Sequence, residues 1–172
     1  FKLVDRNFNQ WWVEQNRSLE RANYGLKFNW ENVSGRRDKL NFNYVNGYNR
    51  QYNIYYEQPF ADKKLEKGFL FGVFYTQTRQ VSFAIDSNQQ VFFPASNNEI
   101  SNFVRSNFRI ESGFTIRKGV NYRHAFRLNY ISENISDTIS RIIENNANKG
   151  YLPFFTGNKT SQKFGEFIYS YQ

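Results

Sequence analysis

The sequence lacks the residue types on which many functional sites depend. It contains no cysteine in 172 residues, so it has neither a disulfide framework nor a thiol metal site. Its one histidine, His124, has no partner at metal-ligand spacing, and we expect a structural role for it. Neither a GxSxG nucleophile motif nor a phosphate-binding loop occurs. We therefore expect no catalytic residue, no metal and no cofactor.

Long hydrophobic runs are also missing. No stretch approaches the run of about 18 apolar residues that a transmembrane helix requires. This absence excludes only the helical route through a membrane. The chain begins at Phe1 without a signal peptide, so we expect a mature chain or a piece of a longer one.

Aromatic residues are abundant although the chain as a whole is polar. They make up 20% of the sequence, while the mean hydropathy is −0.75. Transmembrane β-barrels combine these two properties, because each lipid-facing residue is followed by a lumen-facing one. The net charge of +8 fits a solvated polar face. We find no helix-turn-helix pattern and no basic helix, and so expect no nucleic-acid partner.

A period of two governs residues 24–60. Large apolar side chains occupy every second position of segments 24–31, 40–45 and 52–57, which predicts strands with one apolar face. Further strands are predicted at 69–83, 104–117, 123–130 and 162–171. The positions that we predict to face lipid are Tyr24, Leu26, Phe28, Trp30, Leu40, Phe42, Tyr44, Tyr52, Ile54, Tyr56, Phe108, Ile110, Phe114, Ile116, Phe126, Leu128 and Tyr130.

The alternate positions of the same strands carry polar and mostly basic side chains. In a barrel they would line a hydrated, basic lumen. The positions that we predict to face this lumen are Lys27, Glu31, Lys39, Glu57, Arg105, Arg109, Glu111, Arg117, Arg123 and Arg127.

The carboxylates suggest no catalytic pair. The aspartates fall in turns or loops, where they are expected for turn chemistry: Asp5, Asp38, Asp62, Asp86 and Asp137. Glu31, Glu57 and Glu111 would converge in a lumen, but their spacing does not favour a glycosidase pair over salt bridges to nearby arginines.

The connections between the predicted strands alternate in length. Short turns follow the first, third and fifth strands, and loops of varied length, two of them long, follow the others, as in outer-membrane barrels. A polar loop is predicted at 86–101, and a short helix at 137–146 with Asp137 as its cap. We expect one all-β domain over 1–172, an antiparallel meander of about 7–8 amphipathic strands that forms part of a transmembrane β-barrel. Within it, 1–21 is a leading segment of unassigned structure, in which Trp11 and Trp12 lie either at a membrane interface or over a small satellite core.

Several motifs together resemble the start of the barrel in BamA/TamA-type outer-membrane assembly factors. They are an N-x-x-G turn at Asn32 and Gly35, the pair Gly47-Tyr48, and the strand end at Pro59. Residues 6–35 are most similar to the versions found in Bacteroidetes, and 134–138 resembles a strand end in those relatives. The resemblance places Asn32, Gly35 and Pro59 in turns on the periplasmic side.

The resemblance implies a non-catalytic factor of the bacterial outer membrane that inserts or translocates other barrel proteins by membrane thinning and strand-edge templating. Its partners would be the lipid bilayer, unfolded outer-membrane client proteins and accessory subunits. The chain departs from the family in lacking POTRA domains and the R-G-F loop motif, so it would be the first half of a barrel. Two alternatives remain open: a self-contained porin-like or small barrel with a basic lumen, and a soluble β-sandwich binding an acidic partner.

Overall fold

The computed structural model describes most of the chain. The described residues are 2–3, 8–9, 12–13, 22–86, 89–93, 103–119, 122–145, 153–157 and 159–172.

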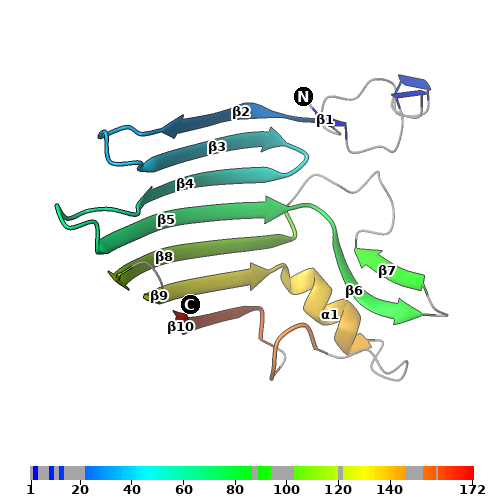
Figure 1. Cartoon of the computed structure of the whole chain (residues 1–172). Coiled ribbons are helices and arrows are strands. Elements are labelled where there is room, and N and C mark those ends of the chain that lie inside the picture. The colour runs from blue at the N-terminus through cyan, green and yellow to red at the C-terminus, as the bar shows by residue number, and fades with distance from the viewer. Residues whose placement is uncertain are drawn as a thin grey trace.

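Eight of the ten strands in the described residues form one antiparallel sheet, in the order β1-β2-β3-β4-β5-β8-β9-β10 (Figure 1). The prediction of an all-β antiparallel meander is confirmed. Within the described residues the sheet is open, because β2 and β10 are not paired with each other. The strands are β1 (Lys2–Leu3), β2 (Ala22–Glu31), β3 (Lys39–Gly47), β4 (Arg50–Gln58), β5 (Lys67–Thr78), β6 (Val81–Asp86), β7 (Gln89–Phe93), β8 (Arg105–Lys118), β9 (Tyr122–Ile135) and β10 (Ser161–Tyr171).

The register of the large sheet is continuous across its strands. Phe28 pairs with Phe42, Phe42 with Ile54, and Ile54 with Val73. The row continues from Val73 to Ile110 in β8. Directly paired residues in antiparallel strands point to the same face, so each apolar position falls beside another one. A slip by one residue would invert a whole strand, and the alternating pattern therefore fixes the pairing.

The connections divide the sheet into two different ends, as the sequence predicts (Figure 1). The β2–β3, β4–β5 and β8–β9 connections meet at one end, here called the turn end. The β3–β4, β5–β8 and β9–β10 connections meet at the other, here called the loop end. The small hairpin β6–β7 and the helix α1 both lie at the loop end.

The predicted strand 69–83 is wrong in its second half. β5 ends at Thr78, and the chain then leaves the large sheet to form β6, which pairs with β7. The polar pair Arg79-Gln80 interrupts the apolar alternation at this point, and the Val104 amide donates to the Thr78 carbonyl at 2.9 Å, beside the start of β8. The polar loop predicted at 86–101 is likewise wrong for 89–93, which is β7.

The predicted sixth strand is too short. It was expected to end at 130, but β9 continues to Ile135 because β8 and β10 both pair with it there. The segment 132–135, which follows the end of the predicted strand, therefore belongs to the sheet.

The predicted helix is confirmed as α1, Asp137–Asn145, but its cap is not Asp137. Ser136 precedes the first helical residue, and its Oγ accepts a hydrogen bond from the Thr138 amide at 3.4 Å. Asp137 instead adds negative charge to the first turn, which favours the positive end of the helix dipole. Ile139 and Ile143 lie one helical turn apart and are both buried.

The buried apolar cluster of the described residues lies at the loop end rather than on the sheet as a whole. It joins α1 to the ends of β6 and β9 and to the segment before β10. Its members are Val81, Val104, Ile135, Ile139, Ile143 and Phe155.

The leading segment contributes one short strand. β1 pairs with the start of β2 through Lys2–Asn23 and Leu3–Ala22. Trp12 stacks on Phe8 with ring centroids 5.3 Å apart, and both rings are exposed. Trp11 lies outside the described residues. No helix in the described part of the chain is long and apolar enough to cross a membrane.

We predict that Ile139→Ala releases α1 from the sheet. Ile139 is fully buried, so the truncation removes apolar contact and leaves a cavity that costs about 2–5 kcal/mol. Hydrogen exchange of the α1 amides should accelerate accordingly. Arg141→Ala on the exposed side of α1 is the control and should change stability by less than about 0.5 kcal/mol. Equal exchange rates in the two variants would contradict the role given to the cluster.

Candidate functional site

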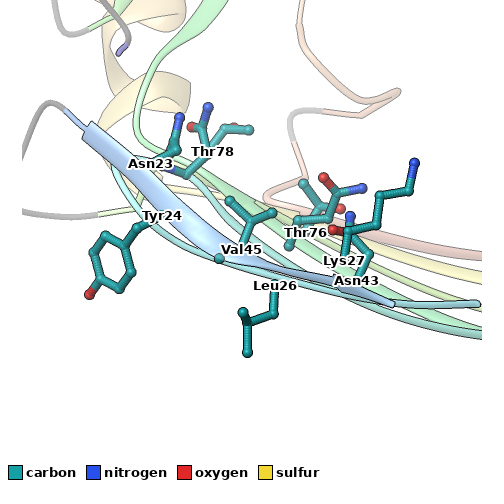
Figure 2. Close-up of a pocket in the computed structure, with 11 residues that line it drawn as sticks. Asn23, Tyr24, Leu26, Lys27, Asn43, Val45, Thr76 and Thr78 are labelled. Atoms are coloured by element: carbon teal, nitrogen blue, oxygen red, sulfur yellow. Dashed lines mark hydrogen bonds between the residues drawn. The ribbon is translucent and has the colours of Figure 1, made fainter. Parts of the chain in front are cut away.

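The two faces of the large sheet differ in chemistry. The register places all of the positions predicted to face lipid on one face, here called the aromatic face. In Figure 2, Tyr24 and Leu26 of β2 project from one side of the sheet, whereas Lys27 of β2 and Asn43 of β3 project from the other. The same face holds further residues that the sequence analysis left out: Phe69, Phe71, Val73, Tyr75, Phe167, Tyr169 and Tyr171.

Large side chains of the aromatic face are widely exposed. Leu26 is 72% exposed, Leu128 59% and Phe167 63%. Among the described residues none forms a second layer over this face, since the elements that leave the sheet gather at the loop end (Figure 1). A continuous apolar surface of this extent marks a contact with lipid or with another protein.

Residue types are ordered along the strands of the aromatic face. Toward the loop end, Tyr44 stacks on Tyr52 at 5.1 Å between ring centroids, and Tyr52 stacks on Tyr75 at 6.0 Å. The next row toward the turn end, which runs from Phe28 in β2 to Ile110 in β8, contains only apolar side chains over these strands. Tyrosine therefore flanks a purely hydrocarbon row on the loop-end side.

A second group of amphipathic rings lies toward the turn end. Trp30 occupies this end of β2, and Tyr169 and Tyr171 occupy the same end of β10. Phe126 contacts Tyr169 at 5.2 Å between centroids. Trp and Tyr favour the boundary between hydrocarbon and water, because each ring has an apolar body and a polar tip.

His124 belongs to this second group. Its Nδ1 lies 2.9 Å from the hydroxyl of Tyr169, and its ring packs against Tyr171 with centroids 5.0 Å apart. The structural role expected for His124 fits these contacts. No group of three or more potential metal-ligating side chains occurs in the described ranges.

The opposite face, here called the polar face, carries the residues predicted to face the lumen. All ten lie on it according to the register. Between β2 and β5 it contains a shallow cavity of about 420 Å³ (Figure 2). The lining of this cavity includes Asn23, Lys27, Asn43, Asn49, Gln51, Thr76 and Thr78.

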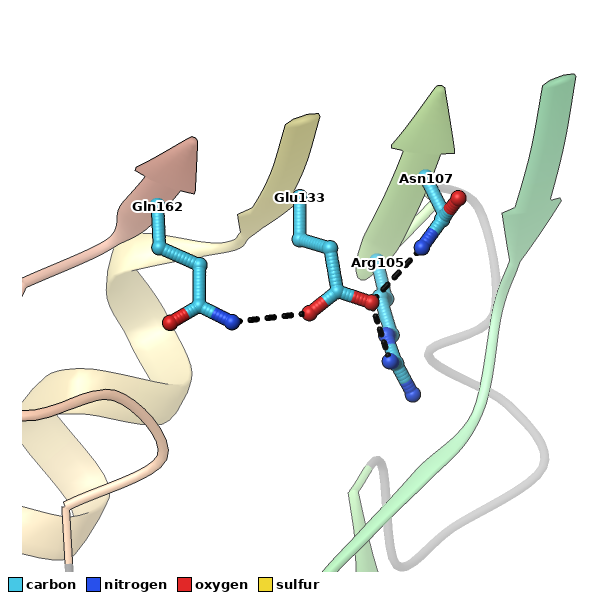
Figure 3. Close-up of polar contacts among 4 residues, drawn as sticks. All are labelled: Arg105, Asn107, Glu133 and Gln162. Carbon is cyan, nitrogen blue, oxygen red and sulfur yellow. Dashed lines mark hydrogen bonds and ion pairs between the residues drawn. The ribbon is translucent and has the colours of Figure 1, made fainter. Parts of the chain in front are cut away.

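The most connected group on the polar face is centred on Glu133 (Figure 3). Its carboxylate accepts hydrogen bonds from Arg105 at 2.7 Å, Asn107 at 2.6 Å and Gln162 at 3.2 Å. These bonds connect β8, β9 and β10. The sequence analysis missed Glu133 because the residue lies beyond the predicted end of its strand.

Glu111 acts as a salt-bridge partner for arginines. Its carboxylate lies 3.6 Å from Arg127 and 4.0 Å from Arg109. Glu57, in contrast, accepts a hydrogen bond from the Tyr55 hydroxyl at 3.2 Å. Of the three glutamates considered in the sequence analysis, Glu111 is thus placed beside arginines.

Arginines of the polar face also contact aromatic rings. The Arg109 guanidinium lies 4.3 Å from the ring centroid of Phe74, and that of Arg105 lies 5.5 Å from Phe154. These cation–π contacts hold Arg109 against β5 and Arg105 against the segment that precedes β10.

The β2–β3 turn is held by its own polar groups. Asn32 and Gly35 both have positive φ, 61° and 79°. Both carboxylate oxygens of Asp38 accept from the Ser34 amide, at 2.9 and 3.1 Å, and one accepts from the Tyr56 hydroxyl at 3.0 Å. Burial alone would raise the pKa of Asp38, but these hydrogen bonds outweigh the desolvation and hold the pKa below its usual value. The Asp38 carboxylate therefore connects the β2–β3 turn to Tyr56 of β4.

Comparison with models of known protein families, with characterised proteins and with solved structures found no match to this chain.

We predict that Glu133→Gln loosens the β8–β9–β10 part of the sheet. The substitution removes the ion pair with Arg105, whose loss should cost about 1.5–3 kcal/mol because the bond is charge-assisted and the Glu133 side chain is only 13% exposed. Denaturant unfolding measures the change. The matched control is Glu144→Gln on the exposed side of α1, which should leave the denaturant midpoint of unfolding unchanged. A midpoint that is equal in both variants would show that the network contributes no stability.

Proposed function

We propose that this chain is part of the wall of a transmembrane β-barrel in the bacterial outer membrane. One observation carries the proposal: a sheet of paired strands has a continuous aromatic face that no described element covers. A soluble protein would bury such a face against a second layer. In a bilayer the same face meets lipid, and its exposure needs no partner layer.

The strand lengths support the proposal. A tilted strand of about 9–11 residues crosses the hydrocarbon core. β2 has 10 residues, β3 and β4 have 9 each, and β10 has 11. β8 and β9 have 14 each, and they would extend past the hydrocarbon. The two groups of Tyr, Trp and His side chains would then lie near the two membrane interfaces.

The polar face fits a hydrated interior. Its charged groups include Lys27 and Arg127, whose side chains are both exposed. Water in a lumen would satisfy these groups, whereas hydrocarbon would not. The basic side chains of this face would give the lumen a positive potential.

Within this class, we propose the role of an assembly factor that inserts or translocates other barrel proteins without catalysis. The proposal rests on the motif resemblance at Asn32, Gly35 and Pro59. The exposed edge of β2 supports it: from Tyr24 to Glu31 only β3 pairs with this strand in the described residues. An unpaired edge can template an incoming strand of a client protein.

A porin-like barrel is the second candidate, favoured by the basic polar face. Its lumen would conduct anions, and its edges would close on strands of the same protein. A soluble sandwich is disfavoured, because the described strands form one large sheet and a small hairpin rather than two packed layers.

The neighbouring residues Phe28 and Asn29 test which face meets lipid. They lie on opposite faces of β2, and both side chains are exposed. Phe28→Arg places a cation on the aromatic face and should destabilise the folded protein by about 2–4 kcal/mol in a bilayer. Asn29→Arg, the matched control, should change stability by less than about 0.5 kcal/mol.

Reversible folding into lipid vesicles provides the measurement. If the aromatic face met water, arginine at position 28 would cost nearly as little stability as arginine at position 29. The one extra cost would be the lost edge contact between Phe28 and Trp30. Equal effects of the two substitutions, with folding that needs no lipid, would therefore exclude the membrane assignment.

Depletion of the protein from cells tests the assembly role. We expect the amounts of other barrel proteins in the outer membrane to fall severalfold and their unfolded precursors to accumulate. Re-expression of the natural protein should restore both. If the other barrels keep their levels while uptake of small anions falls, the porin-like candidate is correct instead.

A further inference from the structure

The turn end of the sheet contains a small basic pocket that the assembly and transport roles do not explain. It lies between the β2–β3 and β4–β5 turns and has a volume of about 300 Å³. Its lining residues are Gly35, Arg36, Arg37, Phe60, Asp62, Lys63 and Leu65.

Three cations and one carboxylate line this pocket, and the carboxylate already accepts hydrogen bonds from its own turn. An oxygen of Asp62 accepts hydrogen bonds from the amides of Glu66 and Lys67, at 2.8 and 2.9 Å. The hydrogen bond from the Lys67 amide makes the largest contribution, and the one from the Glu66 amide adds to it. Together they outweigh the desolvation of the carboxyl and keep the pKa of Asp62 below its usual value. Asp62 therefore stabilises the β4–β5 turn through these hydrogen bonds. An excess of positive charge remains at Arg36, Arg37 and Lys63.

The two arginines are held in place by the fold. Arg36 donates to the carbonyl of Ala61 at 2.8 Å and so joins the two turns. Arg37 has a φ of 59°, which a long side chain rarely adopts, and its amide donates to the Asn32 side chain at 2.9 Å. Its guanidinium lies 5.9 Å from the Phe60 ring centroid. Strained backbone of this kind is typical of functional positions.

The two turns around the pocket contact both faces of the sheet. The Tyr56 hydroxyl of the aromatic face donates to Asp38 of the β2–β3 turn at 3.0 Å, and the Phe60 ring centroid lies 4.8 Å from the Arg117 guanidinium of the polar face. Trp30 is the last aromatic-face residue of β2 before the turn, and Tyr56 occupies the paired row of β4, with Leu40 between them. A ligand in the pocket would thus have a basic cradle at one end and an apolar, aromatic surface at the other. Guanidinium groups match phosphate oxygens in charge and in hydrogen-bond geometry.

We propose that this pocket binds the phosphate of a phospholipid headgroup, whose acyl chains lie along the aromatic face. The inference rests on the proposed membrane location and adds a lipid preference to it: anionic phospholipids should be enriched at the β2–β5 part of the turn end. Basic clusters beside an apolar surface attract such lipids because each cation adds to the attraction.

Quenching of Trp30 tests the proposal in reconstituted vesicles. Trp30 becomes the sole tryptophan in a Trp11→Phe/Trp12→Phe background of the natural protein. Brominated phosphatidylglycerol should quench it at lower mole fraction than brominated phosphatidylcholine does. The triple variant Arg36→Ala/Arg37→Ala/Lys63→Ala should reduce this preference by at least about fivefold.

A second triple variant serves as the charge-matched control. Arg141→Ala/Lys159→Ala/Lys163→Ala removes three exposed cations at the loop end and should leave the preference unchanged. Two equal losses would point to net charge alone and overturn the pocket assignment. No loss in the first variant would overturn it as well.

Two further outcomes distinguish failure of the proposed membrane location from failure of the lipid assignment alone. If no brominated lipid quenches Trp30, the aromatic face does not meet lipid, and both the proposed function and this inference fail. If inorganic phosphate binds through the same three cations while both lipids quench equally, the ligand is free phosphate, and the lipid assignment alone is wrong.

Discussion

The strict alternation of side chains along paired strands is the constraint on which the rest of the structure depends. Directly paired residues in an antiparallel sheet point to the same face. Because the register is continuous from β2 to β10, the alternation within each strand produces one aromatic surface and one polar surface. Between the two edges of the sheet the backbone groups are paired, so the two surfaces are free to meet different solvents. The distribution of rings along the strands follows from the same rows, and it gives the aromatic face a hydrocarbon middle with amphipathic borders.

On the polar face, hydrogen bonds, ion pairs and ring contacts hold the charged and amide side chains. Glu133 gathers donors from three strands, Glu111 lies between two arginines, and Phe74 supports Arg109. The two ends of the sheet are also unlike. The turn end has short polar connections, whereas the loop end carries α1, the β6–β7 hairpin and the one buried apolar cluster found among the described residues. The asymmetry gives the sheet a defined orientation in any layered environment.

Much of the fold was predictable from the sequence, because period-two patterning reports directly on faces. All the predicted positions in Tyr24–Tyr56 fall on the side that their alternation assigns them. The errors in the predicted strand boundaries arise where local composition was misleading about strand pairing. The apolar residues of β6 resume the alternation of β5 after the polar pair Arg79-Gln80, so the two strands were predicted as one and the departure of the chain from the sheet at Thr78 was missed. Glu133 was missed because Ser132 and Asn134 surround it with loop-like composition, although β8 and β10 both pair there. The pocket between two turns was beyond prediction, since its residues meet only through tertiary structure.

The ladders between strands are unequal in length, and this inequality has a mechanical consequence. The β3–β4 ladder runs only from the Lys39–Glu57 pair to the Val45–Gln51 pair, whereas the β8–β9 ladder runs from Arg105–Ile135 to Lys118–Tyr122. Fewer cross-strand bonds mean less resistance to separation, so β2 and β3 can detach as an intact hairpin while β5, β8 and β9 remain together. The sheet therefore has a weak seam built into it, one strand pair away from its exposed edge.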